Sequence, residues 1–142
     1  IHNLLANQKE RQLFLKEENK INTGKELTKQ SLLLSKIEQE WLLKFEAVVS
    51  ENFNNSKFTV LSCAEELFIS ERQLQRRIKK STGLTWSKYI RLTRLTKARR
   101  ILENGTTSTI AEVARSVGFD TPHYFTKLFY KEFGKKPSDF VL

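Results

Sequence analysis

Apolar residues recur along most of the chain at intervals of three and four positions, the spacing of one face of an α-helix. No segment alternates apolar and polar residues with the β-branched enrichment of a strand, and the only prolines are Pro122 and Pro137. The pattern therefore predicts an all-α fold. The first well-formed helix is expected to begin at Ser35, which has capping-box spacing to Glu38, and to end near Ser50.

Two similar units follow that helix, the first over about residues 59–83 and the second over about residues 109–134. They align with an offset of 50 residues, which becomes 51 after Asp120. Each unit is predicted to form a short helix, a tight turn and a second helix, which is a helix-turn-helix. The second unit has Gly118 in its turn, where the first has Phe68, a bulky residue at a position that favours positive φ.

The segment between the units is predicted to form a long helix over about residues 86–103. Thr85 can cap its start, and the pair Asn104-Gly105 can end it. Its apolar stripe consists of Trp86, Ile90, Leu95, Ala98, Ile101 and Leu102. The basic residues Lys88, Arg91, Arg94, Lys97 and Arg100 are expected mostly off this stripe. A helix of this length spans roughly 27 Å, so it could brace two helices that read major grooves roughly 34 Å apart.

Positive charge is concentrated in the part of the chain that contains these units. The net charge of the 142 residues is +9. Residues 1–56 carry 8 basic and 8 acidic side chains, whereas residues 57–142 carry 17 basic and 8 acidic ones. This asymmetry predicts a polyanionic partner for the C-terminal part.

The second helix of the first unit is predicted to have two chemically different faces. Leu74 and Ile78 are four residues apart and mark its buried side, and most of its basic residues lie opposite. An arginine fork matches the edge of guanine and a glutamine can pair with adenine, whereas a lysine suits a phosphate. Ser70 and Gln73 have capping-box spacing at its start. A solvated cationic face on an ordinary helix would give a similar pattern.

The second unit repeats this arrangement, which favours nucleic-acid contact over a merely solvated face. Its core side is marked by Phe125, Phe129 and Phe133. The residues opposite are His123, Lys127 and Lys131. The phenylalanines could also stack on single-stranded bases, but their spacing of four is simpler to explain by core packing.

Other candidate chemistries find little support in the sequence. His2 and His123 have no acidic or cysteine partner at ligand spacing, so no metal is expected. Cys63 is the single cysteine and falls among apolar-facing positions, where a buried structural thiol is expected. Paired carboxylates, a glycine-rich phosphate loop and a Ser/His/Asp set are all missing, so neither an enzyme nor a cofactor is expected. No apolar run approaches the length of a membrane span.

Residues 40–142 resemble the DNA-binding domain of the AraC/XylS family of bacterial transcription regulators. The resemblance is carried by "LFISERQLQRRIKKSTGLTWSKYIRLTRLTKARRIL" and by "IAEVARSVGFDTPHYFTKLFYKEFGKKPSDF". It implies a seven-helix bundle with two helix-turn-helix subdomains joined by a long linker helix. It also implies that the second helix of each unit enters one of two successive major grooves of double-stranded DNA.

Site residues follow from this resemblance together with the chemistry of the two helices. The residues assigned to base reading are Arg72, Gln75, Arg76, His123, Thr126 and Lys127. Those assigned to phosphate contacts are Ser70, Lys79, Lys80, Arg91, Thr121 and Lys131. Arg77 lies nearer the buried edge and is expected to brace the domain.

Residues 1–35 are interpreted as a helical or partly disordered linker, or as the end of an upstream domain, with residues 36–142 forming the DNA-binding domain. The opening "NLLANQKERQLFLKEEN" resembles the end of a receiver domain and its linker, as in hybrid two-component sensors or response regulators. A coiled linker from another sensor domain would look similar. Because the chain opens on Ile1 and contains no methionine, it is expected to be a piece of a longer protein.

The leading hypothesis is the sequence-specific output domain of a transcription regulator that binds double-stranded DNA. RNA polymerase is an expected further partner, and a homodimer could form through upstream or linker residues. This segment is expected in the cytoplasm, even if the longer protein is membrane-anchored. Two alternatives remain: a non-specific polyanion- or RNA-binding basic helical module, and a helical domain whose basic face docks an acidic protein.

Overall fold

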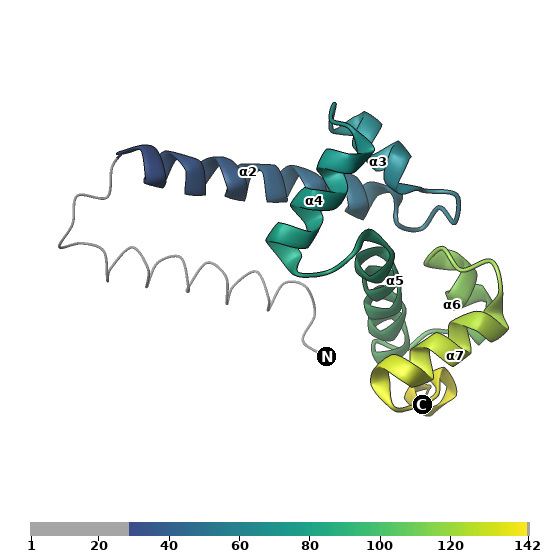
Figure 1. Cartoon of the computed structure of the whole chain (residues 1–142). Coiled ribbons are helices and arrows are strands. Elements are labelled where there is room, and N and C mark those ends of the chain that lie inside the picture. Colours follow the sequence, from purple (N-terminus) through teal and green to yellow (C-terminus); the bar gives the residue numbers. More distant parts are fainter. Residues whose placement is uncertain (1–28, 142) are drawn as a thin grey trace. The chain divides into compact units, whose positions relative to one another are not determined.

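The computed structural model describes residues 29–141, and in this range it contains six α-helices, one 3₁₀ helix and no strand. The prediction of an all-α fold is confirmed. The predicted count of seven α-helices differs from the six observed in this range. The last helical turn, η2 (Pro137–Phe140), is a 3₁₀ helix. Figure 1 shows the α-helices, which are α2 (Lys29–Asn52), α3 (Val60–Glu66), α4 (Glu71–Thr82), α5 (Trp86–Glu103), α6 (Ile110–Ser116) and α7 (Pro122–Phe133).

The chain divides into two compact units, residues 1–46 and residues 47–142, with the division inside α2. The predicted start of this helix at Ser35 is wrong, because the helix already includes Lys29 and continues to Asn52. The leucines that precede Ser35 are good helix formers, so the Ser35–Glu38 spacing occurs within a continuous helix and caps nothing. The part of the predicted linker over residues 1–28 lies outside the described residues.

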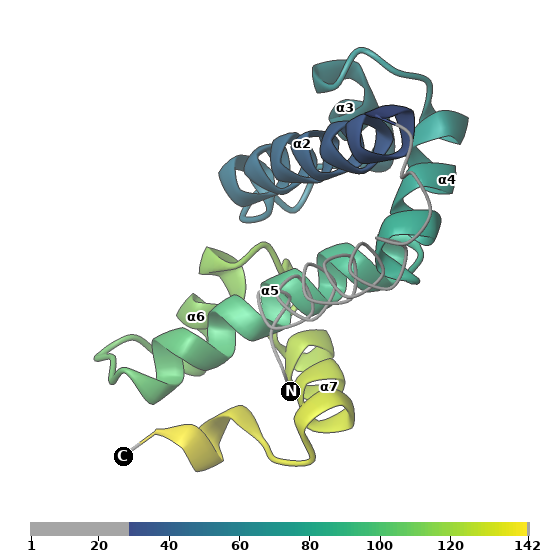
Figure 2. The same cartoon turned by 90° about the vertical axis from the view of Figure 1, so that its left-hand side faces the viewer.

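The first helix-turn-helix consists of α3 and α4, each with a local N-terminal cap. The Thr59 hydroxyl accepts the backbone N–H of Ser62 at 3.1 Å, and the Ser70 hydroxyl accepts that of Gln73 at 3.1 Å. Gly83, with φ of 74°, ends α4 in a left-handed conformation, and Figure 2 shows the chain turning from there into α5. Leu74 and Ile78 are fully buried, which confirms the predicted core side of α4.

The long helix α5 packs against helices of both predicted helix-turn-helix units. Its observed bounds, Trp86–Glu103, match the predicted ones, and the Thr85 hydroxyl caps it by accepting the N–H of Lys88 at 3.3 Å. Near its start, Trp86 makes an edge contact with Phe58, with ring centroids 5.5 Å apart. Its later residues Leu95, Ala98 and Leu102 belong to the core of the second helix-turn-helix.

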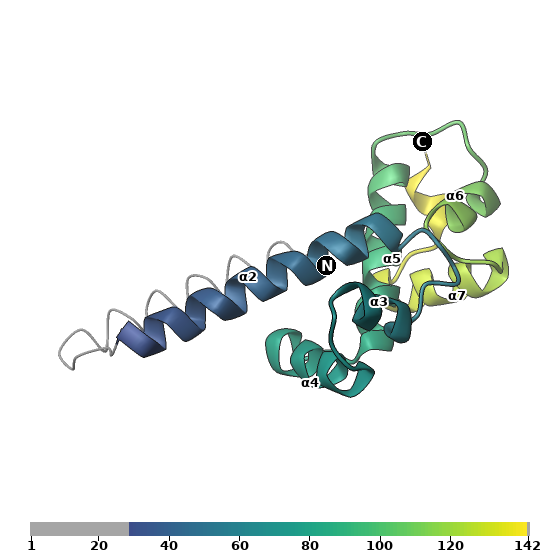
Figure 3. The ribbon, with the colours of Figure 1, turned by 90° about the horizontal axis from the view of Figure 1, so that it is seen from above.

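The second helix-turn-helix, α6 and α7, packs against α5 around an aromatic core, and Figure 3 shows both helices beside α5. Phe125 and Phe129 are fully buried, with ring centroids 5.5 Å apart. The Phe133 ring lies 4.6 Å from that of Phe129, and the Arg99 guanidinium lies over Phe133 at 5.0 Å. The predicted core role of these phenylalanines is therefore confirmed.

The observed position of Arg94 differs from the prediction, because its side chain does not point away from the buried part of α5. Its side chain is half-buried, with Nε–H donating to the carbonyl oxygen of Phe53 at 2.8 Å and an Nη donating to that of Asn55 at 3.0 Å. These carbonyl groups belong to residues just after the end of α2, where the helix no longer supplies backbone N–H donors for them. Burial lowers the pKa of the Arg94 guanidinium, and the nearby charge of Asp120 opposes that shift.

Candidate nucleic-acid interface

The outer face of α4 carries the three residues assigned to base reading in the first unit. Arg72, Gln75 and Arg76 are all exposed, on the side away from the buried leucine and isoleucine. The Gln75 amide donates to the Glu71 carboxylate at 3.4 Å, a weak interaction that a base could replace. The side chains of this face are therefore accessible to a base edge.

The start and the end of α4 are held by its own polar residues. At the start, the Gln73 side-chain oxygen accepts the N–H of Ser70 at 3.1 Å, which completes the predicted capping box. At the end, the Lys79 ammonium donates to the carbonyl oxygen of Gly83 at 3.1 Å. A phosphate at Lys79 would therefore have to compete with this carbonyl. Arg77 is half-buried, in keeping with its predicted position near the edge.

The corresponding face of α7 has a different composition. His123 and Lys127 are exposed, whereas Thr126 is half-buried and its hydroxyl donates to the carbonyl oxygen of Pro122 at 3.0 Å. The Thr126 hydroxyl can therefore accept a hydrogen bond from DNA but has already used its donor. Thr121 makes no side-chain capping bond at the start of α7, so its hydroxyl is not committed there as that of Ser70 is.

Two exposed tyrosines on α7 were missed by the sequence interpretation. Tyr124 is 51% exposed and Tyr130 is 55% exposed. Both lie outside the four-residue series of buried phenylalanines, and that offset was the signal that could have found them. Their rings are available for apolar contact with thymine methyl groups or sugars.

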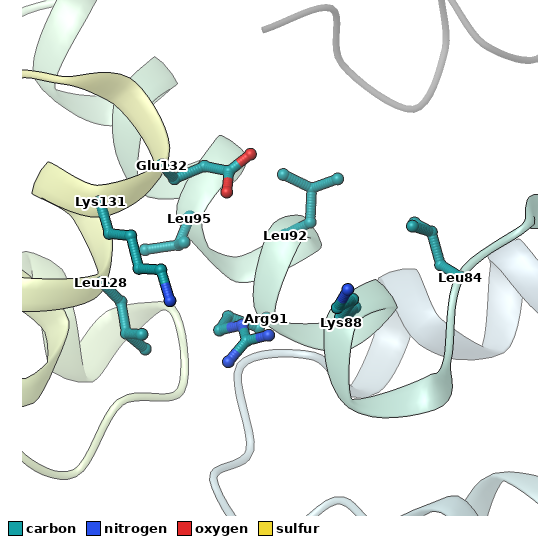
Figure 4. A pocket seen from close by; sticks show the side chains of 8 residues that line it. All are labelled: Leu84, Lys88, Arg91, Leu92, Leu95, Leu128, Lys131 and Glu132. Atoms are coloured by element: carbon teal, nitrogen blue, oxygen red, sulfur yellow. The ribbon is translucent and has the colours of Figure 1, made fainter.

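A hollow of about 300 Å³ lies between α5 and α7, and it brings together two residues assigned to phosphate contacts (Figure 4). Arg91 of α5 and Lys131 of α7 line it together with Lys88, which the sequence interpretation did not select. Leu84, Leu92, Leu95 and Leu128 supply its apolar lining, and Glu132 is its single acidic residue. Three cations around one hollow are suited to an anion such as a backbone phosphate.

A second, more open hollow of about 560 Å³ also has Arg91 in its lining. It is lined by Thr59 from the start of α3 and by Thr121 and Tyr124 from the start of α7. The starts of two different helices therefore line one concave surface. The partial positive charge of the helix dipole at such starts favours anionic groups.

Among the described residues, neither the Cys63 thiol nor a metal-binding cluster provides a functional site that competes with this interface. Cys63 is fully buried, and burial together with the charge of Glu66 raises the pKa of its thiol to about 12. The thiol is therefore protonated and unreactive at neutral pH. Across residues 29–141 no cluster of three or more His, Cys, Asp and Glu side chains could hold a metal ion. His2 lies outside the described residues.

Each helix within residues 29–141 is too short or too polar to cross a bilayer.

Comparison with known proteins assigns the two units to a family. A family model described as a helix-turn-helix domain matches residues 63–141, more than half of the chain. A structure from Chromobacterium violaceum, described as a transcriptional regulator with an AraC-type DNA-binding domain, is similar with a TM-score of 0.66 and 25% identity, over 72% of this chain and 89% of that one. The chain belongs to the AraC family. The resemblance stated from the sequence is thereby confirmed.

Two further relatives are a DNA-bound transcription factor domain and a histidine kinase. The DNA-binding domain of the transcription factor AdpA, solved with a target DNA, matches with a TM-score of 0.64 and 26% identity, over 70% of this chain and 87% of that one. Histidine kinase P4 of Formosa agariphila is 33% identical over 121 residues, or 85% of this chain. The chain spans only 9% of that kinase and 27% of the next curated relative. The AraC-type domain is a sequence-specific DNA-binding domain of transcription regulators.

Proposed function

We propose that this AraC-type domain is the DNA-reading output of a longer signalling protein, and that α4 and α7 enter successive major grooves. The observation that carries the proposal is the repeated arrangement on α5, in which each unit buries one face of its second helix and exposes a polar or basic face. A major groove accepts one such helix, and the linker helix α5 has a length suited to one turn of duplex.

Base reading is assigned to different chemistries in the two grooves. Arg72, Gln75 and Arg76 supply two guanine-matching forks and one adenine-matching amide on α4. On α7, His123 and Lys127 supply donors, and Thr126 supplies a methyl group and an acceptor. Phosphate contacts are assigned to the surrounding side chains Ser70, Lys79, Lys80, Arg91, Thr121 and Lys131.

The signalling context is supported by the similarity to a histidine kinase over most of this chain. RNA polymerase is the proposed partner at the promoter, and dimerisation is proposed through upstream or linker residues. The domain itself contributes DNA binding and no catalysis. Its place of action is the bacterial cytoplasm, because the chromosome is there.

The proposal is tested by selecting bound sequences from a pool of random duplexes. The expected result is a bipartite motif whose halves are centred about 10 base pairs apart. Binding should weaken steeply with salt, because each neutralised phosphate releases counterions. A selection that enriches no motif, together with equal affinity for single strands, would contradict sequence-specific reading and favour the non-specific basic module.

A further inference from the structure

Arg94 of α5 binds the segment that leads into the first helix-turn-helix. This segment, residues 53–59, connects the end of α2 to α3. The Arg94 guanidinium donates to the carbonyl oxygen of Phe53 at 2.8 Å and to that of Asn55 at 3.0 Å. The Asn55 carbonyl oxygen also accepts the backbone N–H of Phe58 at 3.0 Å, two residues before α3 begins. Arg94 is therefore tied to the start of the first unit.

The same segment packs on the second helix-turn-helix. Phe53 is partly buried against the core of that unit, and the Lys97 ammonium lies over its ring at 5.7 Å from the centroid. A Cβ at Gly118, in the turn of the second unit, would lie 2.5 Å from the Phe53 carbonyl oxygen and 2.8 Å from Arg94 Nε. Glycine is required there because the turn comes this close to its neighbours. The connecting segment, α5 and the second turn therefore converge at Arg94.

The turn of the first unit shows that a helix-turn-helix does not need this convergence in order to form. Phe68, the counterpart of Gly118, is 94% exposed, so no neighbouring segment covers its side chain. The two units share the same local fold, yet only the second turn lies against an arginine and a connecting segment. The consequence of these contacts is the placement of one unit relative to the other.

Further connections between the first unit and α5 lie at the start of this helix. Three residues, 83–85, separate α4 from α5, and the Phe58 ring contacts that of Trp86 with centroids 5.5 Å apart. Arg94 follows Trp86 by eight residues, which is roughly 12 Å along the helix. A second point of attachment at this distance resists pivoting of the first unit about the start of α5.

The shape of the arginine side chain suits this attachment. Its planar fork presents the Nε–H and Nη–H groups in fixed directions, so two carbonyl oxygens can be bound at once, whereas a lysine ammonium is a point charge. Hydrogen bonds donated by a charged group are also stronger than neutral ones. The two bonds of Arg94 therefore fix both the distance and the rotation of the connecting segment on α5.

We propose that Arg94 is a positioning residue for DNA recognition, which fixes the spacing and the helical phase of the two half-sites that the domain accepts. This rests on the proposed function, in which α4 and α7 read successive major grooves. One added base pair moves a half-site by roughly 3.4 Å and rotates it by roughly 35°. A rigid pair of units cannot follow that displacement, whereas a pair that pivots about the start of α5 can.

The test measures the affinity of the full-length regulator for duplexes in which the two halves of its selected motif are moved one or two base pairs closer or further apart. The unchanged protein should bind the selected spacing about tenfold or more tighter than the altered ones, because one unit then loses its base contacts. Arg94→Met keeps the stem but removes the donors, and it should reduce this ratio to about threefold or less. A partly unfolded population does not change the ratio, since it weakens binding to every duplex by the same factor.

Arg99→Met is the matched control on the same helix. Arg99 is also half-buried, but its guanidinium lies over Phe133 and Phe140 and pairs with Glu103, none of which belongs to the first unit or to residues 53–59. This variant should weaken binding at every spacing and keep the ratio of the unchanged protein. If Arg94→Met does not fold, Arg94→Lys, which keeps the charge but loses the fork, is measured by the same criterion.

The outcomes separate this proposal from the proposed function. If the unchanged regulator selects no bipartite motif, the proposed function fails. If it selects one but binds all spacings alike, or if Arg94→Met keeps the ratio of the unchanged protein, only the role of Arg94 is overturned. An equal loss of the ratio in Arg99→Met would also overturn it, because any loosening of the domain would then suffice. A salt-dependence slope reduced by about one in Arg94→Met would place the arginine on a phosphate and overturn the positioning role as well.

Discussion

The helices α4 and α7 each have 12 residues and end at a left-handed glycine, yet they expose and bury different side chains. In α4 the buried side is aliphatic and the exposed side carries arginine forks. In α7 the buried side is aromatic, and His123 and Lys127 occupy the positions of Arg72 and Arg76. From this difference we predict that the first unit contributes more of the base discrimination and the second unit more of the stability.

The largest effect is expected from the aromatic core of the second unit. Phe129 is fully buried against the rings of Phe125, Phe133 and Phe140, so Phe129→Ala should lower the free energy of unfolding by about 3–5 kcal/mol. Its counterpart in α4 is Ile78, which is buried in a helix that contains no aromatic residue. Ile78→Ala should cost less, and urea denaturation of both variants measures the difference. A larger loss in Ile78→Ala would reverse the assignment of stability to the second unit.

Substitutions in the turns of the two units should change the stability of the domain in opposite directions. Gly118→Ala places a Cβ 2.5 Å from a backbone oxygen at a φ of 99°, and it should destabilise the domain by about 2 kcal/mol or more. Phe68→Gly should be neutral or slightly stabilising, because it relieves strain and removes no packing. Thermal unfolding of the two variants checks the signs. Destabilisation by Phe68→Gly would show that the phenyl ring packs on the chain.

Base discrimination should be lost more sharply from α4 than from α7. Arg76→Ala should reduce discrimination at one base pair by about 1–3 kcal/mol, because an arginine fork pairs with two acceptors of guanine. Lys127→Ala, at the matching position of α7, should weaken binding with a smaller change in base preference, since an ammonium is a point charge. Affinities for duplexes substituted one base pair at a time provide the measurement. Equal losses of preference would mean that both units read bases to the same degree.

How far the sequence could predict this structure depended on the range of the interactions. The bounds of α5 were predictable because Thr85 and the Asn104-Gly105 pair are local signals. The start of α2 was not, since the spacing of Ser35 and Glu38 imitates a cap inside a continuous helix. The role of Arg94 depends on carbonyl groups 39 and 41 residues away, which no local pattern reveals.

The candidate site shows the same limit. The exposed faces of α4 and α7 follow from helical periodicity and from the positions of the buried residues. By contrast, Lys88 meets Lys131 only through the packing of α7 on α5, and Lys88 was not selected from the sequence. Phe68 was recognised as a residue at a strained position, but its exposure of 94% became evident only from the structure.

The smallest expected effect concerns the helix starts, because Ser70 caps α4 through its side chain whereas Thr121 makes no side-chain cap at α7. The Ser70 hydroxyl accepts the N–H of Gln73 at 3.1 Å, so Ser70→Ala should lower the free energy of unfolding by about 1 kcal/mol. The Thr121 hydroxyl makes no such bond, and Pro122 already fixes the first turn of α7, so Thr121→Ala should change stability very little. Urea denaturation measures both losses without DNA. If Thr121→Ala lowers DNA affinity while leaving stability unchanged, its hydroxyl serves the phosphate contact proposed for it; an equal loss of stability in both variants would show that the two helix starts are held alike.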